Sequence, residues 1–122
     1  MKFSKKNTKI CIIGLGYVGL PLAFEFFKKI KVLGFDNNIS RIMELKNFND
    51  STKEVSKEML MKRKNLSYSN SNNDLLNCNV FIVTVPTPVD INLIPDLNFL
   101  INATEIISKN IKKNDVVTYE ST

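Results

Sequence analysis

Histidine is absent from this 122-residue sequence, and cysteine occurs only twice. Without histidine the chain cannot form a serine–histidine–aspartate triad, an HExxH zinc site or an imidazole proton relay. The two cysteines, Cys11 and Cys78, lie in apolar stretches and lack the CxxC spacing of metal or redox sites. We therefore expect both to be structural residues of a reduced, cytoplasmic protein that holds no metal.

A long uninterrupted apolar run is also missing. The stretch from Ile10 to Phe24 is mainly apolar, but it contains three glycines and one proline and is followed by a glutamate. It is shorter than the ~18 residues that a membrane-spanning helix needs. Its composition also does not suit the helical core of a secretory signal. We predict neither a signal peptide nor a membrane segment.

The net charge of +5 comes from 17 basic and 12 acidic residues, and four of the lysines lie in the first nine positions. The rest of the chain is nearly neutral, and it has no run of arginines interleaved with aromatic residues. This pattern does not indicate a nucleic-acid partner. We predict a basic tail over residues 1–8 and a single domain over residues 9–122, because the length allows no more than one.

Short apolar runs alternate with amphipathic stretches along the chain. Strands are predicted over 10–13, 31–36, 66–69, 80–85 and 115–119, and helices over 18–29, 38–47, 53–64 and 97–107, with one turn ending near residue 77. This alternation is typical of an α/β fold with a doubly wound parallel (Rossmann) sheet of about five strands. No helix follows the last strand, so we expect a domain truncated at its C-terminal end.

A glycine-rich turn follows the first strand and leads into a helix. In this context each glycine of the GxGxxG pattern has a task. Gly14 permits the tight turn, Gly16 lets a pyrophosphate approach the backbone, and Gly19 lets the helix pack against the strand. Pro21 would disturb a helix that began at Tyr17, so we expect the helix to start near Val18. The turn predicts a dinucleotide-binding site.

Asp36 ends the second strand, twenty residues after Gly16. This is the spacing of the carboxylate that accepts hydrogen bonds from both adenosine-ribose hydroxyls of NAD. Its negative charge would repel the 2′-phosphate of NADP, and the neighbouring Asn37 and Asn38 carry no compensating charge. NAD is therefore the predicted cofactor. We also expect Asn38 to cap the following helix.

With these features, the chain resembles the NAD-binding domain of the UDP-glucose/GDP-mannose dehydrogenases, the nucleotide-sugar 6-dehydrogenases. The similarity rests on GLGYVGLP at 14–21, VPTPVD at 85–90, Pro-Asp-Leu at 95–97 and YEST at 119–122. Asp50-Ser51-Thr52, together with the closing YEST, is more similar to the branch that acts on UDP-N-acetylhexosamines. UDP-glucose 6-dehydrogenases are the next most similar.

The resemblance implies where the rest of the cofactor would lie. It places the backbone of Tyr17 and Val18 against the pyrophosphate, Arg41 beside Asp36 at the adenosine end, and Pro86, Thr87 and Thr122 near the nicotinamide half. A glycine is common in the family where this chain has Phe48. We therefore expect Asn47 to take the left-handed backbone conformation instead.

The resemblance also implies an activity. Two NAD oxidise the C6 alcohol of a UDP-sugar to a uronate for surface polysaccharide synthesis, in an enzyme that is usually a homodimer. The family's catalytic cysteine belongs to a later domain, so these 122 residues are expected to hold no catalytic residue and to be inactive alone. We assign no catalytic role to Glu120, which is offset by one position from a family glutamate.

Two other classes share the glycine turn and Asp36. One is a non-catalytic dinucleotide-sensing module that gates a channel or a repressor, and the other is a β-hydroxyacid dehydrogenase. The PTP at 86–88 and the YEST at 119–122 favour the nucleotide-sugar dehydrogenase, because neither alternative is expected to carry both motifs.

Overall fold

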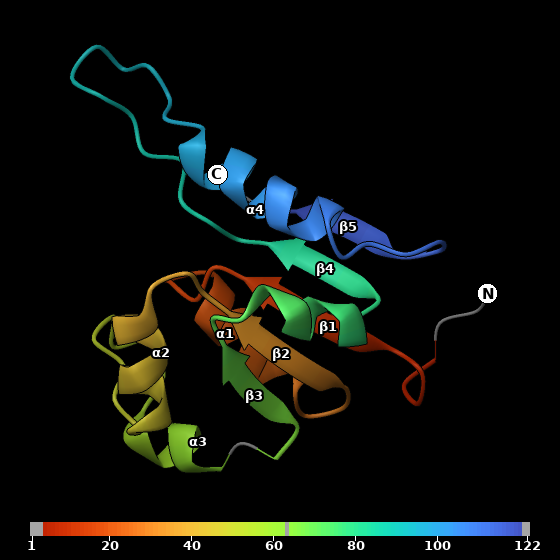
Figure 1. The fold of residues 1–122 in the computed structure, drawn as a ribbon. Coiled ribbons are helices and arrows are strands. Elements are labelled where there is room, and N and C mark those ends of the chain that lie inside the picture. Colours follow the sequence, from red (N-terminus) through yellow and green to blue (C-terminus); the bar gives the residue numbers. More distant parts are fainter. Residues whose placement is uncertain (1–3, 63, 121–122) are drawn as a thin grey trace.

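A computed structural model describes residues 4–62 and 64–120 of the chain. They form a five-stranded sheet in the order β3-β2-β1-β4-β5, in which every neighbouring pair is parallel (Figure 1). The strands are β1 (Lys9–Ile13), β2 (Lys31–Phe35), β3 (Leu66–Ser69), β4 (Val80–Val83) and β5 (Val116–Tyr119). The predicted α/β fold with a doubly wound parallel sheet is confirmed.

Helices cover both faces of the sheet (Figure 1). One apolar cluster joins the sheet to α1, α2 and α3, and a second joins it to η1 and α4. The helices are α1 (Gly19–Phe26), α2 (Ile39–Lys46), α3 (Lys57–Met61), the 3₁₀ helix η1 (Asn72–Asn77) and α4 (Asn98–Ser108).

The central strand β1 shows how the sequence pattern produces this arrangement. Ile10 and Ile12 belong to the first cluster, whereas Cys11 and Ile13 belong to the second, since successive side chains of a strand point to opposite faces. All four are at most 3% exposed, which explains why this strand is a continuous apolar run. Cys78 is buried near Cys11 in the second cluster, and both thiols are free.

Helix α1 begins at Gly19, one residue after the expected start. Pro21 is therefore the third helical residue, where a backbone N–H has no partner within the helix in any case. The proline fits the first turn without disturbing the helix. Helix α2 begins as predicted, with the Asn38 side chain accepting hydrogen bonds from the backbone N–H of Ser40 and Arg41.

Two local expectations are wrong. Phe48, not Asn47, takes the left-handed conformation, with φ of 62° against −91° for Asn47. The half-buried Phe48 ring packs against the first apolar cluster, and this packing offsets the cost of about 1–2 kcal/mol of the left-handed backbone. The helix expected from residue 53 starts only at Lys57, because residues 50–55 form a loop closed by the Asp50 side chain.

Within the described residues, no helix is long and apolar enough to cross a membrane. The same part of the chain contains no group of three or more side chains of the types that bind metals.

Candidate functional site

The glycine turn connects the end of β1 to α1. Gly14 has φ of 97°, a left-handed conformation that glycine adopts without steric cost. Its N–H donates to the carbonyl of Phe35 at 2.9 Å, which fixes the turn to the end of the neighbouring strand β2. The turn is therefore held at the carboxyl ends of two adjacent parallel strands, where ligands bind in sheets of this kind.

The other two glycines differ in their surroundings. A Cβ atom at Gly19 would lie 1.8 Å from the carbonyl oxygen of Gly14 and 2.4 Å from Oγ1 of Thr84, so no side chain fits there. At Gly16, by contrast, a Cβ would meet nothing within 4 Å. The backbone at Gly16 faces open space, as the approach of a pyrophosphate requires, whereas Gly19 serves the packing of α1.

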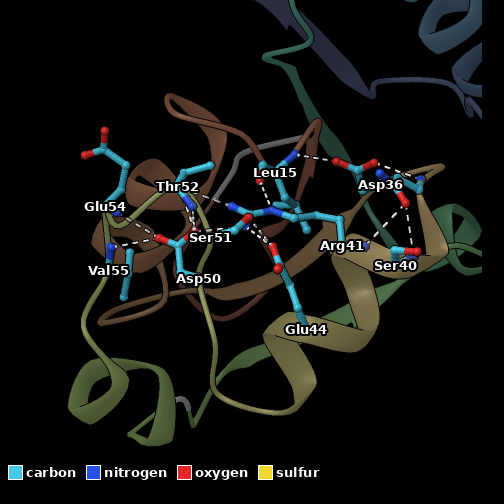
Figure 2. A network of polar contacts seen from close by, with 11 residues as sticks. Leu15, Asp36, Ser40, Arg41, Glu44, Asp50, Ser51, Thr52, Glu54 and Val55 are labelled. Atoms are coloured by element: carbon cyan, nitrogen blue, oxygen red, sulfur yellow. Dashed lines mark hydrogen bonds and ion pairs between the residues drawn. The ribbon is translucent and has the colours of Figure 1, made fainter.

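Asp36 follows β2 directly and faces the glycine turn (Figure 2). Its Oδ2 accepts a hydrogen bond from the backbone N–H of Leu15 at 2.9 Å, and its Oδ1 accepts one from the N–H of Asn38 at 2.9 Å. A carboxylate offers about four acceptor positions, so these two bonds orient the group and leave acceptor capacity for ribose hydroxyls.

Arg41 extends from the first turn of α2 toward the same glycine turn (Figure 2). Its Nε donates to the carbonyl of Leu15 at 2.7 Å, and its Nη1 donates to both Glu44 and Asp50. The side chain is 9% exposed, and its charge is balanced by these two carboxylates. The hydrogen bond from Arg41 also lowers the pKa of Glu44.

Asp50 is the most enclosed of these charged groups, with a side chain that is 0% exposed. Burial by itself raises the pKa of a carboxyl group, but hydrogen bonds from Thr52, Val55 and Arg41 outweigh it and lower the pKa of Asp50 to about 2. Asp50 is therefore ionised at neutral pH. Among the described residues named here, three carboxylates, those of Asp36, Glu44 and Asp50, face the one guanidinium of Arg41, and this excess of negative charge disfavours an additional phosphate at this end of the site.

A pocket of about 510 Å³ opens at the carboxyl ends of the strands. Five of the predicted site residues line it: Gly14, Gly16, Asp36, Arg41 and Pro86. Its apolar wall combines residues of β1, β2 and α4, including Ile13, Phe35, Ala103 and Ile106. A pocket of this size, with an apolar wall and a few convergent polar groups, suits a nucleotide.

The other predicted site residues do not line this pocket. Tyr17 and Val18 lie in the turn before α1 and are 69% and 48% exposed. Gly19 packs beneath the turn, and the half-buried Thr87 lies just beyond Pro86. Thr122 lies outside the described residues.

Several lining residues were missed in the sequence. The buried Thr84 donates its hydroxyl to the carbonyl of Gly14 at 2.7 Å. Strand β4 ends at Val83, two residues before the predicted end, so the available signal for Thr84 was its place near the carboxyl end of the predicted strand. On the far wall, Asn102 of α4 accepts a hydrogen bond from the Asn37 side chain at 3.4 Å. Asn98 and Phe99 line the same wall. No motif marks these three α4 residues, because they reach the site only through the packing of that helix on the sheet.

The residues present fit NAD. The open backbone at Gly16 leaves room for its pyrophosphate, and Asp36 faces the pocket with spare acceptor capacity. The guanidinium of Arg41 is held by two carboxylates and does not supply a free cation for a 2′-phosphate.

Comparison with known proteins agrees with this geometry. The model of the UDP-glucose/GDP-mannose dehydrogenase family, NAD binding domain, matches residues 8–122. UDP-N-acetyl-D-glucosamine 6-dehydrogenase of Pseudomonas aeruginosa is 54% identical over 117 residues, which are 96% of this chain and 28% of that protein. The enzyme of the same name from Salmonella typhi is 46% identical over 120 residues, covering 98% of this chain and 28% of that protein.

Among solved structures, the UDP-D-ManNAc dehydrogenase of Pyrococcus horikoshii superposes with a TM-score of 0.86 at 28% sequence identity. The match covers 94% of this chain and 28% of that one, so the chain spans little more than a quarter of the length of the relatives it matches. The family model matches nearly the whole chain, and the matched residues 8–122 include the glycine turn, Asp36 and the parallel sheet. The chain thus belongs to the UDP-glucose/GDP-mannose dehydrogenase family and corresponds to its NAD-binding domain.

Proposed function

We propose that the pocket at the carboxyl ends of β1, β2 and β4 binds NAD for a UDP-N-acetylhexosamine 6-dehydrogenase. The observation that carries this proposal is the position of Asp36, which faces the pocket beside a glycine turn whose backbone is open at Gly16. An acidic group at this place recognises a ribose with both hydroxyls free.

Each candidate residue has a role in this proposal. Asp36 accepts the ribose hydroxyls, and Arg41 lies beside it at the adenosine end. The pyrophosphate lies along the glycine turn, against Gly14, Gly16 and the backbone of Tyr17 and Val18, while Gly19 admits α1. The family resemblance assigns Pro86, Thr87 and Thr122 to the nicotinamide half.

Bound NAD supplies a hydride acceptor. The protein's contribution at this site is to bind and orient the dinucleotide. The family resemblance implies that a cysteine of another domain completes the oxidation. We therefore expect the 122 residues to bind NAD without turning it over.

The substrate is proposed from the relatives. Proteins of 54% and 46% identity carry the name UDP-N-acetyl-D-glucosamine 6-dehydrogenase, which supports a UDP-N-acetylhexosamine in preference to UDP-glucose. The product would be the corresponding uronate, made in the cytoplasm for surface polysaccharide. We also expect the complete enzyme to be a homodimer and to have no nucleic-acid partner.

Titration calorimetry with NAD and NADP tests the cofactor assignment. We expect saturable binding of NAD and at least about tenfold weaker binding of NADP, because a 2′-phosphate would meet the carboxylate of Asp36. Equal or tighter binding of NADP would reject the assignment.

A panel of UDP-sugars tests the substrate class. The panel is assayed with the product of the complete gene, and the reaction is followed by NADH absorbance. Exclusive oxidation of UDP-glucose would reject the proposed substrate class.

A further inference from the structure

Asp50 lies in the loop between α2 and α3, and its two oxygens have different partners. Oδ2 accepts hydrogen bonds from the backbone N–H groups of Glu54 and Val55 at 2.8 and 3.0 Å, which closes the loop on itself. Oδ1 accepts from Nη1 of Arg41 at 2.8 Å and from both the N–H and the hydroxyl of Thr52. Oδ2 thus binds the backbone of its own loop, and Oδ1 binds Arg41 and Thr52.

The contact between Asp50 and Arg41 continues to the glycine turn (Figure 2). Nε of Arg41 donates to the carbonyl oxygen of Leu15, the residue between Gly14 and Gly16. The N–H of Leu15 is bound by Asp36. Both backbone polar groups of Leu15 are therefore held by charged side chains of α2 and the β2–α2 connection.

The charge of the buried Asp50 carboxylate costs free energy to bury, and the buried guanidinium of Arg41 opposite compensates that cost. Arg41 in turn has its Nη2 3.4 Å from the hydroxyl of Thr52. The guanidinium is thus fixed from the loop side by Asp50 and Thr52 and from its own helix by Glu44.

We propose that Asp50 is a positioning residue of the NAD site, which holds Arg41 against the carbonyl of Leu15 and so fixes the glycine turn before the cofactor arrives. This inference rests on the NAD-binding function proposed above. Asp50 does not touch the cofactor. It acts by removing conformational freedom from Arg41 and the turn, and a site that is already ordered binds its ligand more tightly.

The substitution Asp50→Asn tests this directly. An amide has a single oxygen, so when that oxygen satisfies Glu54 and Val55, its NH₂ group points at the guanidinium of Arg41. We expect the Kd for NAD to rise about tenfold. The matched control is Asp115→Asn, which neutralises another largely buried aspartate. Asp115 directly precedes β5 and pairs with Lys112, and its substitution should leave the Kd unchanged.

A second readout reports on Arg41 itself. The chain contains only two arginines, so the Nε–H signal of Arg41 in a ¹H–¹⁵N spectrum is identified by its loss in Arg41→Lys. We expect a signal protected from exchange in the wild type and in Asp115→Asn, and shifted and exchanging faster in Asp50→Asn. In the Arg41→Lys background, Asp50→Asn should change the Kd by less than twofold, since the residue acts through Arg41.

Thr52→Val provides a milder test if Asp50→Asn does not fold. It removes the hydroxyl that joins Asp50 to Arg41 and keeps the shape of the side chain. We expect a two- to threefold rise in the Kd with a shifted Arg41 signal.

The inference is overturned if the folded variants leave the Arg41 signal and the Kd as in the wild type, or weaken binding equally in the Arg41→Lys background. If the wild type binds no NAD, the proposed function fails instead, and the Arg41 signal still shows whether the contact exists.

Discussion

The carboxylate of Asp36 accepts a hydrogen bond from the backbone N–H of Leu15 at 2.9 Å, across 21 positions of the chain. This bond ties the end of β2 to the glycine turn that follows β1. The residue expected to bind the ribose thus also orients the loop expected to bind the pyrophosphate. The ribose site and the pyrophosphate site are consequently coupled. We expect a substitution in one of them to change binding at the other.

Asp36→Asn is predicted to weaken NAD binding about tenfold or more, because a hydrogen bond to a charged group contributes roughly 1.5–3 kcal/mol. The same variant should discriminate less between NAD and NADP, since the repulsion of the 2′-phosphate is removed. Calorimetric titration with both cofactors measures the two effects.

Asp74→Asn is the control for that experiment. Asp74 lies in η1 and accepts the hydroxyl of Ser69, outside the pocket that Asp36 lines. The Asp74→Asn variant should bind NAD with the same Kd as the wild type. An Asp36→Asn variant that matched Asp74→Asn in its preference for NAD over NADP would contradict the role of Asp36.

Gly16→Ala is predicted to impair binding without impairing folding. The added methyl group would meet no atom within 4 Å, so the free energy of unfolding should stay within about 0.5 kcal/mol of the wild type. The same methyl group would occupy the space in which a pyrophosphate approaches the backbone, and we expect about tenfold weaker NAD binding. Urea denaturation and calorimetry check the two parts, and unchanged affinity would show that the pyrophosphate lies elsewhere.

Gly19→Ala is predicted to show the opposite pattern, a loss of stability. The new Cβ would lie 1.8 Å from the carbonyl oxygen of Gly14 and 2.4 Å from the Thr84 hydroxyl, and neither can move aside freely. Overpacking of this kind costs about 1–3 kcal/mol or more. The urea midpoint should fall clearly below that of Gly16→Ala, and equal midpoints would be inconsistent with the close packing of α1 on the turn.

Acid is predicted to weaken the fold partly through Asp50. The pKa of this group is lowered to about 2 in the folded protein, whereas an aspartate carboxyl in the unfolded chain has a pKa of about 3.9. The contribution to stability is therefore complete above about pH 4 and is lost as the pH falls through about 2. The size of this contribution is about 2–3 kcal/mol. Urea denaturation of the wild type and Asp50→Asn should show that the difference between their free energies of unfolding becomes smaller as the pH falls from about 4 to about 2. A difference that stays constant over this range would contradict the prediction.

Much of the fold follows from local patterns. Four of the five strands were recognisable as short apolar or β-branched runs, and the fifth, Leu66–Ser69, as a short, weakly apolar stretch. The Asn38 cap follows from a side chain that reaches the free N–H groups of its own helix. The site was predictable where it is built from contiguous sequence, as in the glycine turn. It was not predictable where α4 supplies the wall, because Asn102 and Ala103 are ordinary residues of an amphipathic helix.

Phe48 illustrates the limit of local reasoning. Its backbone conformation is unfavourable for a phenylalanine, and a neighbouring asparagine would have adopted it more easily. The chain nevertheless places Phe48 there because the ring gains apolar contacts with the core that Asn47 could not make. Packing between distant segments thus outweighs a preference of one residue.

The sequence by itself determined the alternation of strands and helices, the glycine turn and the acidic residue at the end of β2, because these depend on spacing along the chain. The tertiary structure alone decided that Arg41, Asp50 and Leu15 meet, that Gly19 faces Thr84 and that α4 closes the pocket. Hydrogen bonds and van der Waals contacts act over a few ångströms, so they join whichever residues the fold brings together, however far apart they lie in the sequence.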